Sequence, residues 1–151
     1  QIMVLKIKAV DTSHEYQDVL KIRKKVFIDE QKISEKIEID SNEKSSKYII
    51  ALINSIAVGT ARWRDDGSKV KLERFAVLKE HRNKGIGRKL NEFILKQVPV
   101  NRTIYLNSQE SAIGFYENLG FEVSGSSFKE AGIIHKKMIY QRNNKMKPWI
   151  F

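Results

Sequence analysis

Hydrophobic and polar positions change periodicity several times along the chain, and the changes predict alternating strands and helices. Apolar and basic residues alternate over residues 3–10, as in a half-buried strand. Residues 14–30 then carry apolar side chains at helical spacing, after polar residues that could cap a helix. Residues 31–43 are polar and irregular, with room for a short second helix. Residues 48–54 and 56–63 flank Asn54-Ser55 and predict a β-hairpin.

The second half of the chain continues the pattern after the turn signal Asp65-Asp66-Gly67. The predicted elements are a strand at 70–77, a helix at 88–96, a strand at 103–107, a helix at 108–119 that Gly120 ends, and strands at 121–123 and 133–141. The order is βα(α)βββαβαββ. It indicates an α/β (α+β) domain built around a mixed, mostly antiparallel sheet with flanking helices.

Composition narrows the class of protein. The 151 residues predict a single domain, residues 1–151, with a basic tail at 142–151. No apolar stretch is long enough to span a membrane and no signal-peptide pattern begins the chain, so we expect a cytoplasmic protein. Cysteine is absent, which excludes disulfides and thiolate nucleophiles. Three separated histidines give no metal-ligand spacing, so no metal is expected.

The net charge of +10 suggests an anionic partner, which could be nucleic acid, a membrane surface or a small polyanion. The basic residues are scattered rather than gathered in one block, and no base-stacking aromatic motif accompanies them. We therefore expect phosphate-bearing small molecules rather than nucleic acid or a membrane.

A basic, glycine-containing turn lies between the strand at 70–77 and the next helix. It consists of Arg82, Asn83, Lys84, Gly85, Ile86, Gly87 and Arg88. Its backbone N–H groups and the positive end of the helix could hold a phosphate or pyrophosphate. The lysine and serine or threonine of a nucleotide-hydrolase loop and the third glycine of a dinucleotide fingerprint are missing. The alternative is an ordinary strand-to-helix turn.

Four segments together resemble one family. Residues 77–87 resemble the acetyl-CoA signature Arg/Gln-x-x-Gly-x-Gly/Ala of the GNAT superfamily of N-acetyltransferases, and residues 112–121 resemble its later Phe-Tyr-x-x-x-Gly-Phe segment. Residues 22–31 and 128–135 are similar to small bacterial-type members of the same superfamily. The resemblance spans nearly the whole chain and implies a splayed sheet.

The resemblance also implies where acetyl-CoA, the co-substrate, would bind. It would lie between the strand that ends at Val77 and the strand that ends near Asn107, with the pantetheine amides pairing with the backbone of Phe75, Ala76 and Val77. The turn from Arg82 to Gly87, with Arg88, would hold the pyrophosphate, and Asn107 would contact the pantetheine arm. The Val77 amide could polarise the acetyl carbonyl.

The implied reaction is direct transfer of the acetyl group to an amine, since the chain has no cysteine to acylate. Tyr116 matches the family's tyrosine that protonates the departing sulfur, although it could be a core aromatic residue alone. Glu73 is a candidate base, because strand alternation would place it on the same face as Phe75. An ion pair with Lys71 or Arg74 is the equally weighted alternative for Glu73.

The acceptor is less well defined. Basic residues on the first helix suggest that the acceptor carries an anionic group. Glucosamine 6-phosphate N-acetyltransferases have a similar Gly-Phe-Tyr-Glu-x-x-Gly-Phe segment. The expected acceptor is therefore glucosamine 6-phosphate, a small phosphorylated amine. Residues 73–77 depart from the usual pattern of those enzymes. The candidate acceptor-binding residues are Arg23, Gln31, Glu73 and His135. His135 could equally be structural.

Two alternative functions and a possible homodimer remain open from the sequence. The acceptor could be another small amine or a protein lysine. The domain could instead be a non-catalytic CoA-binding or nucleic-acid-binding module. The three apolar side chains in residues 147–151 also suggest a contact in a homodimer.

Overall fold

The computed structural model describes residues 3–142, and its internal contacts group them into two compact units. The first unit contains the residues up to Arg64 together with Glu73–Val100. The second contains Asp65–Leu72 and the residues from Asn101 onward. One strand, β4 (Lys69–Val77), contributes to both units, because the boundary falls between Leu72 and Glu73. The expected dimer contact at residues 147–151 lies outside the described residues.

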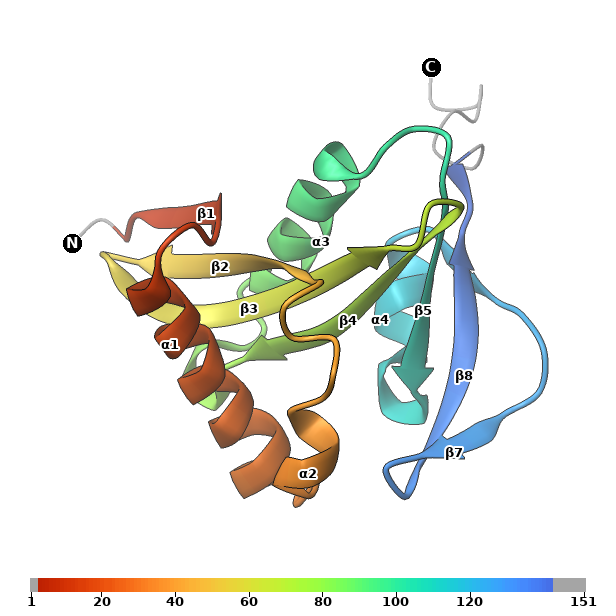
Figure 1. Cartoon of the computed structure of the whole chain (residues 1–151), viewed down its shortest axis with the longest axis horizontal. Helices are drawn as coiled ribbons and strands as arrows, with labels where there is room; N and C mark the ends of the chain where they lie inside the picture. The colour runs from red at the N-terminus through yellow and green to blue at the C-terminus, as the bar shows by residue number, and fades with distance from the viewer. Residues whose placement is uncertain (1–2, 143–151) are drawn as a thin grey trace. The chain divides into compact units, whose positions relative to one another are not determined.

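In the first unit, helices lie on both faces of a sheet in the strand order β1-β2-β3-β4 (Figure 1). Its elements are β1 (Leu5–Ala9), α1 (Ser13–Arg23), the π-helix η1 (Lys24–Glu30), α2 (Glu35–Glu38), β2 (Lys47–Ile53), β3 (Ile56–Asp65), the 3₁₀ turn η2 (Lys79–His81) and α3 (Ile86–Gln97). The pairs β1–β2 and β2–β3 are antiparallel. The predicted hairpin at Asn54-Ser55 is confirmed.

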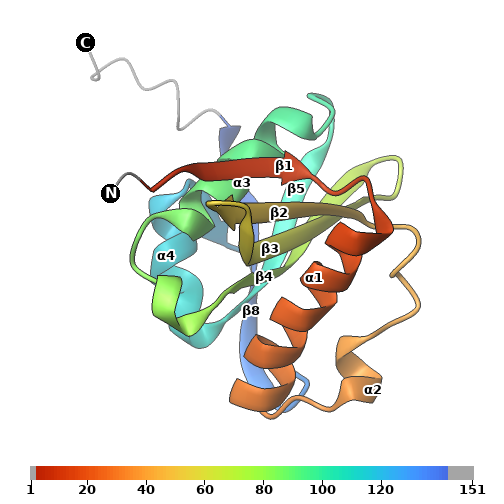
Figure 2. The ribbon, with the colours of Figure 1, turned by 90° about the vertical axis from the view of Figure 1, so that its left-hand side faces the viewer.

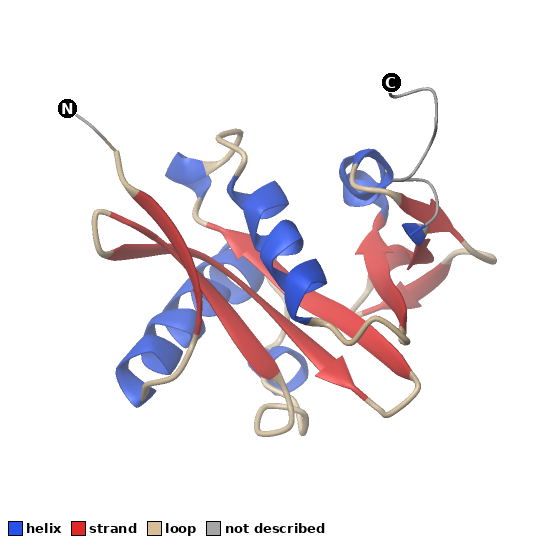
Figure 3. Cartoon of the chain, turned by 90° about the horizontal axis from the view of Figure 1, so that it is seen from above, coloured by secondary structure: helices blue, strands red, loops and turns tan. Residues whose placement is uncertain are grey.

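The helix α1 begins where the sequence can cap it. The Thr12 hydroxyl accepts a hydrogen bond from the Glu15 N–H, and the Glu15 carboxylate accepts one from the Asp11 N–H. This reciprocal capping satisfies N–H groups that would otherwise lack partners. The buried side chains Val19 and Ile22 then pack α1 against the sheet, across β2 and β3 in Figure 2. Figure 3 shows α3 on the opposite face of these strands.

The second unit is a smaller sheet in the order β4-β5-β8-β6, with β7 paired to β8. Its elements are β5 (Thr103–Gln109), η3 (Glu110–Ala112), α4 (Ile113–Asn118), β6 (Phe121–Val123), β7 (Phe128–Glu130) and β8 (Ile133–Tyr140). Strands β4 and β5 are parallel, paired from Lys69–Thr103 to Leu72–Leu106. The pairs β5–β8, β6–β8 and β7–β8 are antiparallel, so the predicted mixed, mostly antiparallel sheet is confirmed.

In the second unit one predicted boundary is wrong and one strand was missed. The helix predicted from Ser108 begins only at Ile113, because Ser108 and Gln109 continue β5 and pair with β8. The strand β7 was not expected. It forms a hairpin with β8 through Ala131 and Gly132, whose φ angles of 54° and 76° suit a tight two-residue turn. Among residues 3–142, no helix is long and apolar enough to cross a membrane.

Candidate active site

The basic turn forms the start of α3 and has the geometry of an anion site. Gly85 precedes α3 with φ 80°, and Asn83 is also left-handed at φ 64°. The N–H of Lys89 donates to the Gly85 carbonyl at 3.1 Å, and the N–H groups before it lie in the first turn, where helices offer no internal acceptor. These donors and the helix dipole favour a bound anion. Residues 82–88 lead into α3 and form its first turn, and their binding of a pyrophosphate stays a prediction.

The first turn of α3 is fixed closely against the sheet. Ile86 is buried, and a Cβ atom on Gly59 of β3 would lie 3.1 Å from its Cγ2 atom. The same Cβ would lie 3.4 Å from the carbonyl oxygen of Ala76. Ile86 thus anchors the turn, while Gly85 and Asn83 give the backbone its shape.

Arg82 is held by protein groups. Its Nε donates to the Val77 carbonyl at 2.9 Å, and its two terminal nitrogens donate to Glu30 at 2.7 and 2.8 Å. The hydrogen bonds from Arg82 lower the pKa of Glu30 below its usual value. These contacts use three of the five guanidinium N–H groups. Arg82 therefore links the end of η1, the end of β4 and the basic turn.

Glycine at position 85 should be required for the ligand and not only for the fold. We expect Gly85→Ala to lower the affinity for acetyl-CoA about tenfold or more, because its methyl group would face the anion site. The left-handed backbone should also reduce the free energy of unfolding by about 1 kcal/mol. Isothermal titration calorimetry and urea denaturation measure the two effects.

Gly67 supplies a matched control for Gly85→Ala. It lies in the β3–β4 turn with φ 98°, and a Cβ atom at either glycine would meet nothing within 4 Å. Gly67→Ala should therefore reduce stability by a similar amount and leave acetyl-CoA affinity unchanged. Equal affinities for the two variants would contradict an anion site at Gly85.

Glu73 is engaged by arginine side chains. Its carboxylate lies 2.7 Å from Arg64 Nε, 3.2 Å from Arg62 Nη2 and 3.8 Å from Arg74 Nη1, with 9% of the side chain exposed. These contacts favour a role for Glu73 in ion pairs over a role as the base. Its partners are Arg74, as the sequence suggested, and also Arg62 and Arg64 of β3. Arg74 has φ 58°, so the strict alternation expected between Glu73 and Phe75 is interrupted.

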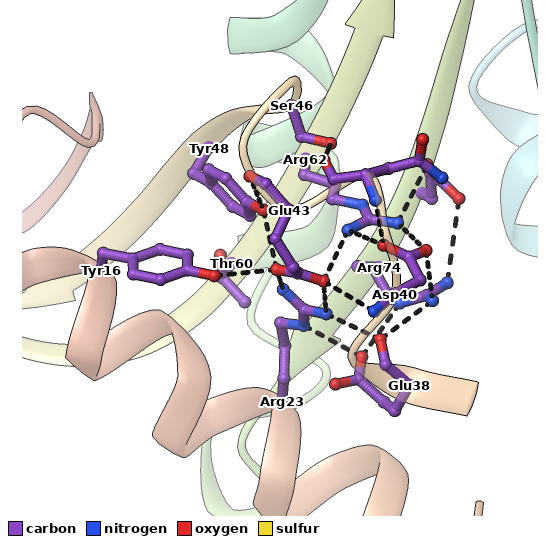
Figure 4. Close-up of polar contacts among 12 residues, drawn as sticks. Tyr16, Arg23, Glu38, Asp40, Glu43, Ser46, Tyr48, Thr60, Arg62 and Arg74 are labelled. Carbon is purple, nitrogen blue, oxygen red and sulfur yellow. Dashed lines mark hydrogen bonds and ion pairs between the residues drawn. The ribbon is translucent and has the colours of Figure 1, made fainter. Parts of the chain in front are cut away.

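Arg23 does not present its charge to a ligand. Its side chain is 1% exposed and forms ion pairs with Glu38 at 2.9 Å and Glu43 at 2.8 Å. Figure 4 shows it within a cluster contributed by α1, α2, the following loop, β3 and β4. The expectation that Arg23 binds the acceptor is therefore corrected. Basic residues of an amphipathic helix are normally solvated. Arg23 is buried because Glu38 of α2 and Glu43 of the following loop cover it.

The same cluster, which we call the arginine cluster, balances its own charge. It contains four arginines, Arg23, Arg62, Arg64 and Arg74, and four carboxylates, Glu38, Asp40, Glu43 and Glu73. With four charges of each sign it offers no net charge to an anionic acceptor. It fixes the loop between η1 and β2 to the sheet.

Tyr116 lies in the aromatic core of the second unit. Its ring is 5.9 Å from Phe121 and 4.9 Å from Phe115, and Phe121 contacts Tyr140 at 5.2 Å. Burial raises the pKa of the Tyr116 phenol well above its usual value. A phenol that stays protonated can donate a proton, as the resemblance implies, and packing alone would explain the same position.

Asn107 lies on the face of the second sheet whose side chains are partly exposed. Along β5, Ile104, Leu106 and Ser108 are buried while the alternate positions, Asn107 among them, are partly exposed. Asn107 is paired with Lys137 of β8. The ammonium groups of Lys137 and Lys69 lie 4.9 and 5.9 Å from the centre of the Tyr105 ring. We call Tyr105, Asn107, Lys69 and Lys137 the Tyr105 face.

His135 lies in the β7–β8 hairpin, and Gln31 caps the C-terminal end of η1. His135 is buried, and its Nδ1 lies 2.7 Å from the Ile133 carbonyl, which can only accept a hydrogen bond, so Nδ1 carries the proton. Its ring stacks on Phe128 at 6.0 Å. The N–H of Gln31, directly after η1, donates to the Val26 carbonyl. Their acceptor-binding roles stay predictions. Across residues 3–142, no group of three or more potential ligands could hold a metal ion.

Sequence reasoning missed Glu38, Asp40 and Glu43 of the arginine cluster and the lysines of the Tyr105 face. The spacing Glu38-x-Asp40-x-x-Glu43 within an otherwise irregular stretch was a usable signal. In the structure Asp40 and Glu43 pair with Arg62 of β3. The alternation of Tyr105 with apolar residues in β5 was a signal for the face on which the two lysines lie. Neither set is contiguous in the sequence, so its members meet only in the fold.

Comparison with known proteins identifies the family. A sequence profile of the acetyltransferase (GNAT) domain matches residues 10–142. In Bacillus subtilis, the uncharacterized protein YyaT is 36% identical over 140 residues, covering 89% of this chain and 94% of YyaT. The uncharacterized N-acetyltransferase YjcF of the same organism is 36% identical over 138 residues, covering 88% of this chain and 99% of YjcF. A crystal structure of a putative N-acetyltransferase from Lactobacillus plantarum superposes with a TM-score of 0.81, at 22% identity, over 91% of this chain and 97% of that one. The chain therefore belongs to the GNAT family and is an acetyl-CoA-dependent N-acetyltransferase.

Proposed function

We propose that this acetyltransferase acts on the primary amine of a small anionic molecule, with glucosamine 6-phosphate as the leading acceptor. The observation that carries the proposal is the Tyr105 face. There the Lys137 ammonium lies over the Tyr105 ring and beside Asn107, the residue that the family resemblance assigns to the pantetheine arm. An ammonium group near the reacting end of acetyl-CoA would attract an acceptor that carries a phosphate. The names of the relatives reported above specify no acceptor.

The proposed reaction has one transfer step. The neutral amine attacks the thioester carbonyl of acetyl-CoA, and the C–S bond breaks as the C–N bond forms. Tyr116 donates its phenolic proton to the departing sulfur and takes a proton back from water before the next turnover. Glu73 is already committed to three arginines, so we propose that it supports the site and that the ammonium proton leaves to water.

A thiol-release assay with paired acceptors tests the proposal. We expect CoA release from acetyl-CoA with glucosamine 6-phosphate, and a KM for glucosamine about tenfold higher or more. Lys137→Gln should raise the KM for glucosamine 6-phosphate by a similar factor and leave that for glucosamine unchanged. Lys24→Gln is the control, because Lys24 is an exposed lysine on η1.

Two results would redirect the proposal. Thiol release with polyamines or lysine peptides, and none with the sugar phosphate, would favour another amine or a protein lysine as acceptor. If none of the amines causes thiol release, and the protein binds nucleic acid with an affinity that falls steeply with salt, a binding module is favoured.

A further inference from the structure

Arg74 adopts a backbone conformation that arginine rarely takes. Its φ of 58° lies in the left-handed region, within a strand whose other residues are extended. Such a conformation costs free energy for a residue with a Cβ atom and persists only where surrounding contacts enforce it. It falls between the stretch of β4 that pairs with β5, which ends at Leu72, and the segment Phe75–Val77. The backbone at Arg74 therefore joins these two parts of β4, and the second part also lies beside β3, to which the next residue, Leu78, donates a hydrogen bond at the Val58 carbonyl.

The Arg74 side chain is held by contacts from α2 and the loop after it. Nη2 of Arg74 donates to the Glu38 carbonyl at 3.1 Å and to Asp40 at 3.2 Å, and Nε lies 2.9 Å from the Glu38 carboxylate. Both acidic residues are held in turn. Glu38 binds Arg23 at 2.9 Å, and Asp40 binds Arg62 at 2.6 Å (Figure 4). With Glu38 2% exposed, this arrangement has little freedom to relax.

We propose that Glu38 and Asp40 are positioning residues for acetyl-CoA, acting through Arg74. By binding the Arg74 guanidinium they hold the left-handed turn in β4, and the turn sets the direction of Phe75–Val77. The proposal rests on the assignment of Phe75–Val77 to the pantetheine arm. It gives the loop between η1 and β2 a role in binding the acetyl donor, although the loop contains none of the residues in the acetyl-CoA signature.

Two substitutions at one position separate the backbone from the side chain. Arg74→Ala removes the guanidinium and leaves a residue that disfavours positive φ, so β4 should relax to an extended form. Arg74→Gly removes the same contacts, but glycine takes positive φ about as readily as negative. We expect Arg74→Ala to bind acetyl-CoA about tenfold more weakly than Arg74→Gly by calorimetry, and Arg74→Gly to lie within about threefold of the wild type.

A second variant guards against loss of the fold. Arg74→Lys keeps the positive charge, but a single ammonium cannot reproduce the planar fork that reaches Glu38 and Asp40 together. We expect it to weaken acetyl-CoA binding several-fold and to keep a cooperative unfolding transition. Glu38→Gln should weaken binding in the same direction, because an amide is a poorer partner for Arg74.

Different outcomes would contradict the role of Arg74 and the binding of acetyl-CoA at Phe75–Val77. Equal acetyl-CoA affinities for Arg74→Ala and Arg74→Gly, whether both unchanged or both reduced, would show that the backbone at Arg74 does not position the ligand. Wild-type affinity in Arg74→Lys would overturn the role of the two carboxylates. If Phe75–Val77 does not bind the donor, Val77→Pro, which bulks that edge and removes its N–H, would leave wild-type affinity intact.

Discussion

Replacing Tyr116 by phenylalanine is expected to lower kcat about 100-fold while changing the Kd for acetyl-CoA by less than about twofold. The substitution removes only the hydroxyl group, and the ring contacts with Phe115 and Phe121 remain. Loss of the proton donor raises the barrier to thiolate departure without affecting how the donor binds. Steady-state thiol release and calorimetry with acetyl-CoA measure the two quantities separately.

Tyr140→Phe is the matched control for this substitution. Tyr140 is buried in the same aromatic core, with its ring 5.2 Å from Phe121, and loses the same hydroxyl group. Its kcat should stay within about twofold of the wild type. A similar kcat for both variants would assign Tyr116 to the core alone.

The raised pKa of Tyr116 leads to an expectation for the pH profile of kcat. Because burial disfavours the phenolate, Tyr116 should remain protonated at alkaline pH. The wild-type kcat should therefore show no loss from tyrosine ionisation near pH 10, the usual pKa of a phenol.

The sequence predicted elements well where a local signal determined them. Asn54-Ser55 at the hairpin and Gly120 at the end of α4 have the positive φ angles that their turns require. Prediction failed where pairing with a distant strand decided the outcome. Ser108 reads as a helix start from its neighbours, yet it continues β5 because Lys136 lies opposite it.

The same division holds for the candidate site. Residues 82–88 are contiguous, so their spacing alone predicted a turn that the structure places at the start of α3. Arg23 was misassigned because its partners Glu38 and Glu43 are 15 and 20 residues away, across an irregular loop. A charge pattern on one helix cannot show whether distant carboxylates cover it.

Substitution of Glu43 by glutamine is expected to reduce the free energy of unfolding by about 3 kcal/mol at pH 7. The carboxylate accepts hydrogen bonds from Arg23 at 2.8 and 2.9 Å, from Arg62 at 3.0 Å, from Tyr16 at 2.9 Å and from Tyr48 at 2.8 Å. An amide has one acceptor oxygen, and its NH₂ group would face donors. Two buried guanidinium groups would lose part of their compensating charge. Urea denaturation followed by circular dichroism measures the change.

The sign of the pH dependence follows from the pKa of Glu43. Burial alone would raise it, but the hydrogen bonds from Arg23 and Tyr48 outweigh burial and hold it well below its usual value. A carboxyl whose pKa is lower in the folded than in the unfolded chain stabilises the fold above its unfolded pKa and loses that contribution as pH falls. The stability difference between wild type and Glu43→Gln should therefore be full at pH 7 and shrink below about pH 4.3.

Asp29→Asn provides the control for Glu43→Gln, because Asp29 pairs with Lys24 at 3.4 Å on an exposed surface. It removes a carboxylate from an ion pair as Glu43→Gln does, but water already solvates both partners, so stability should change by less than about 0.5 kcal/mol. A loss equal to that of Glu43→Gln would mean that burial of the arginine cluster does not govern its contribution. A stability difference that persists undiminished at pH 3.5 would mean that the amide disturbs packing and that the charge of Glu43 is not what stabilises the loop.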